Sequence, residues 1–533
     1  MSVNNKKISE IKNSFSNKKI ISLISAIFIV SLLIRLYYYD SSIPITNDSL
    51  NYFFYAMDIK ITGHIPENYS LGNNGWPLFL SLFFSTFQFD NVQNYMQLQQ
   101  VITILISSLT IIPVYLLCKR FFNPIYSMIG AAIIGFEPHL IQNSIFGITD
   151  SLYIFLIASA FWLFLDSRQK IVYCSFGLVA IATIVRSEGI FLFFTISLMY
   201  FIINRKNRQE LVRYVFALAI FFLILTPMIL YQTSIYGDDR MFTRAAIGME
   251  HLKTDCSVCG SDNISGMPFI LQGIENFPKY LGFSMIPVLI FFVPIGIILV
   301  LKNLNAKTSI LISSLVIMSL PAFYAYAISL QDLRYLFFLY PIFCVVSLFT
   351  IRKLLDAIPQ RKNLVILLIL IGIIVLSIFY LNEKIDNIHQ NESIEIAKIL
   401  SGSKKTVNDY SPESTFLEIS DINFSMTDFR LYFFNERIMN ESIRNSIQHN
   451  VITVEINDFN SMDELIKLAE KNGITHLVVD LENNENELLI EIYKNENEFV
   501  FLDKIFDSNE DGFEHEMKVF KINYERFNEN RLE

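Results

Sequence analysis

Two acidic residues stand beside long apolar segments, where a carboxylate could act as a general base. Asp48 follows the first apolar run, in the sequence NDSLNYFFYA, and Asp150 opens another in GITDSLYIFL. A carboxylate so placed can take the proton of an acceptor hydroxyl. Either acid could instead begin a helix, where a negative charge suits the helix dipole. The residues alone leave both interpretations open.

Two tyrosines accompany the first of these acids. Asp48, Tyr52 and Tyr55 have the spacing i, i+4 and i+7, which places all three on one face of a helix. We therefore expect Tyr52 and Tyr55 to bind substrate beside Asp48. The alternative is that these tyrosines lie at the membrane interface, where aromatic side chains are enriched.

Further charged residues lie at the ends of other apolar runs. Glu137 and His139 precede Asp150 in GFEPHLIQNSIFGITD, and Arg186 and Glu188 follow a run in VRSEG. Glu137 could also simply end a helix before a proline. Together with Asp150, these side chains would deliver charge to one membrane surface.

Arg334, in LQDLRYLFFLYP, is a second arginine at such a position. Guanidinium groups bind phosphate bidentately, so Arg186 and Arg334 are candidates for holding a lipid phosphate headgroup. The alternative is local pairing, of Arg186 with Glu188 and of Arg334 with Asp332. Both alternatives remain open from the sequence.

The composition defines the elements that must position these residues. The 533-residue chain is 52% hydrophobic and 17% charged, with a mean hydropathy of +0.41. These values are typical of a polytopic membrane protein. Apolar runs approach the ~20 residues that a helix needs to cross the bilayer. About 11 transmembrane helices are expected, near residues 20–39, 98–118, 124–141, 149–165, 171–186, 189–204, 214–233, 282–301, 309–328, 335–351 and 363–380.

Lysine and arginine clusters fall on alternate connections between these runs, as the positive-inside rule requires. This pattern places a short segment, residues 1–19, in the cytoplasm and residues 20–381 in the membrane. It also places the loops that carry Asp48 and Asp150 on the outer side. The first run is better explained as a retained anchor than as a cleaved signal peptide, because ten more runs follow it.

Residues 382–533 form a polar tail that we expect to be a soluble extracytoplasmic α/β domain. NVITVEIND and ITHLVVDLE have the composition of strands, and SMDELIKLAEKNG between them has the pattern of an amphipathic helix. FVFLDKIFD and HEMKVFKIN predict a closing pair of strands.

Charge and cysteine usage limit the possible partners. A net charge of −9 argues against nucleic acid as a partner, since the basic residues lie on the cytoplasmic connections. Cys256 and Cys259 form CSVC in an outer loop, where a short local disulfide is favoured over half of a zinc site.

The layout of these segments resembles the GT-C membrane glycosyltransferases, and within them the dolichyl-phosphate-mannose protein mannosyltransferase and aminoarabinose-transferase-like group. The resemblance covers nearly the whole chain. The segments that carry it are IRLYYYD, NDSLNYFFYA, NNGWPLFLSLF, SIFGITDSLYIFL, VRSEGIFLF, LRYLFFLYP and the tail.

The resemblance implies transfer of a sugar from a polyprenyl (dolichyl)-phosphate-linked donor to a protein, lipid or glycan acceptor at the outer membrane face. Asp48 would inherit the role of the general base, and Asp150 the place of a second-loop acid. A divalent metal is a possible cofactor, Mg or Mn in preference to Zn, with Asp150, Glu137 and His139 as tentative ligands.

Two alternative functions, from other classes of membrane protein, are compatible with the same apolar runs. A multi-span transporter or lipid flippase would place ionisable residues near mid-membrane, often within internal repeats. The candidate residues here gather at helix ends instead, which favours an enzyme. A membrane scaffold whose tail binds a partner is the third possibility.

Overall fold

A computed structural model of the chain describes residues 17–43, 45, 48–66, 73–204, 208–237, 269–385, 391–392, 416–419, 451–454, 461–471, 476–481, 487–514 and 516–530. The chain divides into two compact units. The first comprises residues 1–39, 67–80 and 99–385, and the second comprises residues 40–66, 81–98 and 386–533. The predicted Cys256–Cys259 disulfide lies outside the described residues.

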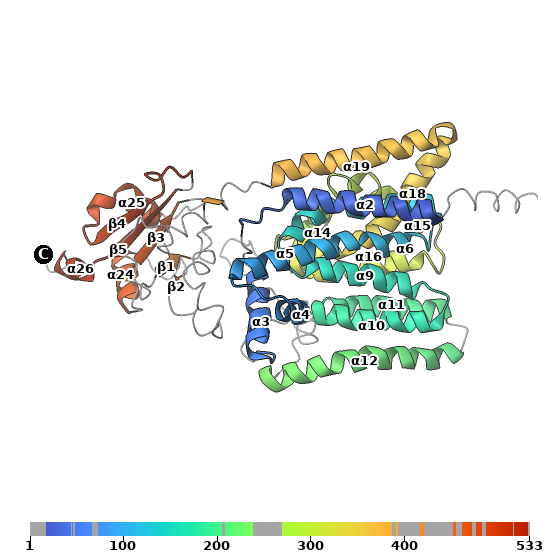
Figure 1. Cartoon of the computed structure of the whole chain (residues 1–533), viewed down its shortest axis with the longest axis horizontal. Coiled ribbons are helices and arrows are strands. Elements are labelled where there is room, and N and C mark those ends of the chain that lie inside the picture. Colours follow the sequence, from blue (N-terminus) through green and yellow to red (C-terminus); the bar gives the residue numbers. More distant parts are fainter. Residues whose placement is uncertain are drawn as a thin grey trace, which may run out of the picture. The chain divides into compact units, whose positions relative to one another are not determined.

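The first unit is a bundle of apolar helices (Figure 1). Its amino-terminal part contains α2 (Asn17–Tyr38), the first half of α4 (Gly75–Thr86), most of α5 (Val92–Leu109), α6 (Ile111–Cys118), α7 (Pro124–Gly135), α8 (Pro138–Ile145), α9 (Asp150–Phe164), α10 (Gln169–Val185), α11 (Gly189–Asn204) and α12 (Arg208–Tyr236). Its later part contains α14 (Phe269–Met285), η1 (Leu289–Phe291), α15 (Val293–Lys302), α16 (Ser309–Met318), α17 (Leu320–Ala327), η2 (Leu333–Leu339), α18 (Tyr340–Ala357), η3 (Pro359–Arg361) and α19 (Lys362–Lys384).

Every apolar run identified in the sequence forms helix, but the described part of the chain supports fewer spans than expected. Six helices are long and apolar enough to cross a membrane, or up to eight if each of two bent pairs counts as one span. Four more apolar helices, α4, α9, α10 and α11, have 12 to 17 residues. They are shorter than the ~20 residues of a full crossing. The protein is therefore a multi-pass membrane protein, and a count of about 11 spans is not confirmed.

The helices nearest the candidate residues are held by close backbone contacts. A Cβ on Gly75 in α4 would lie 2.7 Å from the backbone nitrogen of Val185, at the end of α10. A Cβ on Gly189 in α11 would lie 2.6 Å from the backbone nitrogen of Thr183. Both distances are too short for any side chain, so glycine is required at each position. The last turn of α10 is thereby fixed from two sides.

The second unit contains α3 (Asp48–Thr62) and a five-stranded sheet. The strands are β1 (Phe416–Ile419), β2 (Val451–Val454), β3 (His476–Asp480), β4 (Leu502–Asp507) and β5 (Met517–Ile522), in the order β2-β1-β3-β5-β4 (Figure 1). Strand β1 pairs in parallel with β2 and β3, whereas β5 pairs antiparallel with β3 and β4. The helices α24 (Met462–Lys471), α25 (Glu487–Lys494) and α26 (Tyr524–Asn530) accompany them.

The tail thus has the strand and helix segments predicted from the sequence, in an order that differs in one respect. The closing pair, β4 and β5, is confirmed. The predicted strand-helix-strand unit corresponds to β2, α24 and β3, but β1 lies between its two strands. The sheet therefore needs a strand from an earlier part of the tail to complete it.

Candidate active site

A proline positions Glu137 and His139 at a break between two helices. The helices α7 and α8 meet at a bend of 47°. Pro138 is the first residue of α8, and Glu137 before it is extended, with φ −66° and ψ 116°. A residue before proline is driven away from helical angles, which explains the break. The two predicted side chains therefore leave the chain at the same corner.

Glu137 and His139 contact each other inside the bundle. His139 Nδ1 lies 2.9 Å from Glu137 Oε1, and both side chains are buried. On the other side of the ring, His139 Nε2 shares a 3.1 Å hydrogen bond with the hydroxyl of Tyr380 in α19. The imidazole also lies against the rings of Tyr340 and Phe337. The pair is therefore already engaged with three other elements of the bundle, α19, α18 and η2.

Asp150 and Arg186 form an ion pair that joins the start of α9 to the end of α10. Arg186 Nη1 bonds Asp150 Oδ1, and Nη2 lies 2.9 Å from Glu188 Oε1. The Asp150 side chain is 4% exposed and the Arg186 side chain 12%. Arg186 itself is extended because α10 ends at Val185. One guanidinium thus holds two carboxylates, which gives it a fixed position and leaves the cluster with a net negative charge.

Arg334 and Asp332 lie close enough to this cluster to act on the charge of Asp150. The Asp332 side chain accepts a 2.8 Å bond from the backbone nitrogen of Arg334 and a 2.5 Å bond from its Nε. Both residues belong to the start of η2, which packs against α9. The local pairing anticipated as an alternative is therefore present, and the pair still contributes charge to the neighbourhood of Asp150.

The structure thus gathers four of the predicted residues, Asp150, Arg186, Glu188 and Arg334, into one region. Sequence reasoning did not include two tyrosines of this region. The ring of Tyr153 lies 5.8 Å from the Arg186 guanidinium carbon, and Tyr335 experiences the charges of both arginines. The position of Tyr153, one helical turn after Asp150, was the signal that could have identified it.

Asp48, Tyr52 and Tyr55 belong to the second unit. Asp48 is the first residue of α3, which agrees with the expectation that a helix begins there. Its side chain lies outside the described atoms. Tyr52 and Tyr55 are both buried, with exposed fractions of 8% and 0%. Their predicted role in substrate binding, like that of Asp48 as a base, stays a prediction.

The side chains proposed for a metal do not form a metal site. Among the residues with described side chains, no group of three or more His, Cys, Asp or Glu could hold an ion. Asp150 is paired with Arg186, and Glu137 with His139, so the three tentative ligands are not assembled around one point. The donor set seen here therefore does not fit a divalent metal, and no chemical step is assigned to one.

An apolar cavity of about 530 Å³ lies between α4, α5, α9 and α10. Its lining is almost entirely hydrocarbon and includes Leu78, Phe79, Leu109, Phe155 and Val185. Val185 precedes Arg186 directly, so the cavity and the ion cluster share the end of α10. A volume of 300–1,000 Å³ is usual for small-molecule sites. The cavity itself suits the hydrocarbon part of a ligand.

These features define a multi-pass membrane protein with an arginine-centred site at helix ends beside an apolar cavity. Residues 76–231 match the family model described as dolichyl-phosphate-mannose-protein mannosyltransferase. The matched segment contains α9, α10 and the Asp150–Arg186 pair. The predicted resemblance to GT-C membrane glycosyltransferases is supported by this match, which covers less than half of the chain. No curated protein sequence matches the chain.

Solved structures of two glycosyltransferases share the fold. The aminoarabinose transferase ArnT from Cupriavidus metallidurans, bound to undecaprenyl phosphate, is 10% identical with a TM-score of 0.58. The match covers 95% of this chain and 98% of that one. The Archaeoglobus fulgidus oligosaccharyltransferase with Zn and sulfate is 15% identical with a TM-score of 0.55, over 88% of this chain and 68% of that one.

The same archaeal enzyme, AglB, was also solved with an inhibitory peptide and a dolichol-phosphate. That structure is 13% identical with a TM-score of 0.54, and the match covers 89% of this chain and 70% of that one. At these identities the likeness establishes the fold.

Proposed function

We propose that this enzyme transfers a sugar from a polyprenyl-phosphate-linked donor to a protein, lipid or glycan acceptor at the outer membrane face. The observation that carries the proposal is the position of Arg186, which is 12% exposed and directly follows Val185, a residue of the apolar cavity lining at the end of α10. The cavity would take hydrocarbon of the lipid, and the guanidinium would bind its phosphate. The family match and the lipid phosphates bound by two proteins of the same fold support this donor class.

The reaction is a single displacement at the anomeric carbon of the sugar. The acceptor oxygen forms a bond to that carbon as the bond to the phosphate oxygen breaks, and the lipid phosphate leaves with the bonding electrons. Arg186 and Arg334 would stabilise the negative charge of the departing phosphate. Asp48 would take the proton of the acceptor hydroxyl. A single displacement inverts the configuration of the anomeric carbon.

Asp150 has a different role in this proposal from the one expected of a base. The Asp150 carboxylate is paired with Arg186 and would orient the guanidinium toward the phosphate. Glu188 forms a second ion pair with the Arg186 guanidinium. Asp150 and Glu188 are thus positioning residues for the cation. Glu137, Tyr52 and Tyr55 remain candidates for contact with the substrates.

The experiment measures transfer of radiolabelled sugar from a panel of polyprenyl-phosphate donors in membranes that contain the enzyme. Asp48→Asn and Arg186→Gln should each abolish transfer at wild-type levels of inserted protein. Arg352→Gln is the matched control, because Arg352 pairs with Asp356 on an exposed face of α18. Full transfer by well-inserted Arg186→Gln would overturn the role of the cation. Failure of the wild type with every donor would favour a transporter or flippase.

A further inference from the structure

A guanidinium is buried in the first helix of the bundle without a carboxylate partner. Arg35 in α2 has an exposed fraction of 0%, and among the described residues no acidic side chain pairs with it. Its bonds go to neutral acceptors instead, namely the carbonyl oxygens of Ser31 and Gly135 and the hydroxyls of Ser31 and Ser107. A charge in this position is costly, and such residues within membrane segments usually serve a function.

The acceptor of two of these bonds, Ser107 Oγ in α5, also lines a small polar cavity. Arg35 donates to it through Nε at 3.2 Å and through Nη2 at 3.0 Å. A hydroxyl has two lone pairs and one hydrogen, so both lone pairs are taken and the hydrogen still needs an acceptor. No acceptor for it exists among the described residues, and the hydrogen is available to the cavity.

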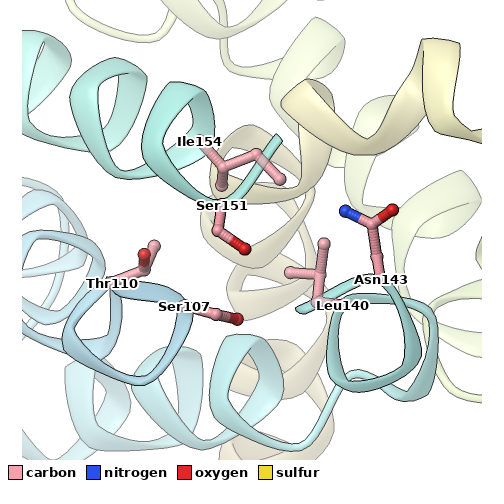
Figure 2. A pocket seen from close by; sticks show the side chains of 6 residues that line it. All are labelled: Ser107, Thr110, Leu140, Asn143, Ser151 and Ile154. Atoms are coloured by element: carbon pink, nitrogen blue, oxygen red, sulfur yellow. The ribbon is translucent and has the colours of Figure 1, made fainter. Parts of the chain in front are cut away.

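The cavity has room for about one water molecule. Its volume is about 10 Å³, close to the smallest space that a water needs. Figure 2 shows the hydroxyls of Ser107 and Ser151 facing one another, with Thr110 and the amide of Asn143 at the sides. Asn143 is 3% exposed, and its Oδ1 has no hydrogen-bond partner among the described residues. The lining also includes Leu140 and Ile154, but its three hydroxyls and one amide supply the several polar partners that a buried water requires.

The far side of the cavity belongs to the candidate active site. Ser151 follows Asp150 in the first turn of α9, and Asn143 lies near enough to influence the charge of the Asp150 carboxylate. Arg35 therefore approaches the Asp150–Arg186 pair through Ser107, the cavity and the start of α9. A small polar molecule in the cavity would complete this connection.

We propose that the cavity is a water site and that one buried water bridges Ser107 and Ser151, coupling Arg35 to the start of α9. Through this water Arg35 acts as a positioning residue for Asp150 and hence for Arg186. The water donates to the neighbouring oxygens and accepts the hydrogen of Ser107, so that the buried charge is spread over a hydrogen-bonded chain rather than neutralised by one acid. The effect on donor binding rests on the proposed function, whereas the water site itself does not.

The first test is independent of activity. A structure at a resolution that shows ordered waters should contain one within hydrogen-bonding distance of Ser107 Oγ and Ser151 Oγ. A direct hydroxyl contact in place of the water would overturn the proposal. A double-mutant cycle of Arg35→Lys and Ser151→Ala, measured as the shift in thermal unfolding, should show that the two changes are less than additive. Additive shifts would equally overturn it.

The second test measures donor and acceptor kinetics separately. Ser151→Ala and Arg35→Lys should each raise the donor KM about 3- to 10-fold, the range expected for one lost hydrogen bond, with the acceptor KM unchanged. Ser159→Ala is the matched control, because Ser159 is buried in the same helix and does not line the cavity. An unchanged donor KM alongside a less-than-additive unfolding cycle would retain the water site and exclude its link to the donor.

Discussion

Removal of the Arg186 charge should destabilise the folded protein as well as stop transfer. Arg186→Gln leaves Asp150 and Glu188 without their cation, and the exposed fractions of these two side chains are 4% and 18%. Removing one partner of a buried ion pair typically costs about 3–5 kcal/mol, because the remaining charge cannot be solvated. Removing one partner of an exposed pair costs about 0–1 kcal/mol. Arg352→Gln, whose side chain is 58% exposed, provides that comparison.

The free energy of unfolding should be measured for both variants in one detergent, together with the double variant Arg186→Gln/Asp150→Asn. The double variant should be more stable than Arg186→Gln alone, because Asp150→Asn removes the carboxylate charge that Arg186→Gln leaves buried without its cation. Equal losses for Arg186→Gln and Arg352→Gln would refute the buried ion cluster. A double variant that is less stable than the single would refute the assignment of Asp150 as its main partner.

Three further predictions concern other parts of the molecule. Gly75→Ala should lower both the thermal stability and the donor affinity, because the added Cβ would lie 2.7 Å from the backbone of α10. Wild-type stability and wild-type donor affinity in this variant would contradict that contact. Ile181→Trp should narrow the apolar cavity and so raise the donor KM. Leu198→Trp, on an exposed face of α11, should leave the donor KM unchanged. Equal changes of the donor KM in both variants would exclude the cavity as the lipid site. In the tail, a hydrogen bond and the charge of Lys518 lower the pKa of Glu496. The Glu496–Lys518 contact therefore stabilises the sheet fully above the ordinary glutamate pKa, and this stabilisation is lost as the pH falls through the lowered pKa. The protection factors of the β5 amides in the full chain, which are corrected for the pH dependence of intrinsic exchange, should therefore fall in acid for the wild type and change less with pH in Glu496→Gln. Identical pH profiles of the protection factors would disprove the contribution.

The candidate residues could be identified from the sequence because charge at the end of an apolar run is unusual. Arg186 and Arg334 both stand at the ends of apolar runs, and the structure places both near Asp150. Their partners were harder to identify. Glu188 is local to Arg186, but Asp150 lies 36 residues away, and only the packing of α9 on α10 brings the two together.

Other features could not be derived from local pattern. Arg35 lies inside an apolar run, where its burial depends on Ser107 and Gly135 from other helices. The expected count of about 11 spans is not confirmed by the described helices, because apolar runs of 15 to 17 residues form helices whether or not they cross the bilayer. The place of β1 in the sheet depends on pairing between distant segments, which strand patterns do not specify.

The glycine contacts at the end of α10 separate two properties that a lipid-dependent enzyme must control. Gly75 and Gly189 hold the last turn of α10 through its backbone, so the direction in which Arg186 leaves the helix is set without the side chains of α10. Those side chains are then free to shape the neighbouring cavity. A change of residue at Ile181 or Ile184 would alter which hydrocarbon fits, while the anchor for the anionic head stays in place. Selectivity for the lipid chain and retention of its phosphate can therefore evolve separately on the same helix.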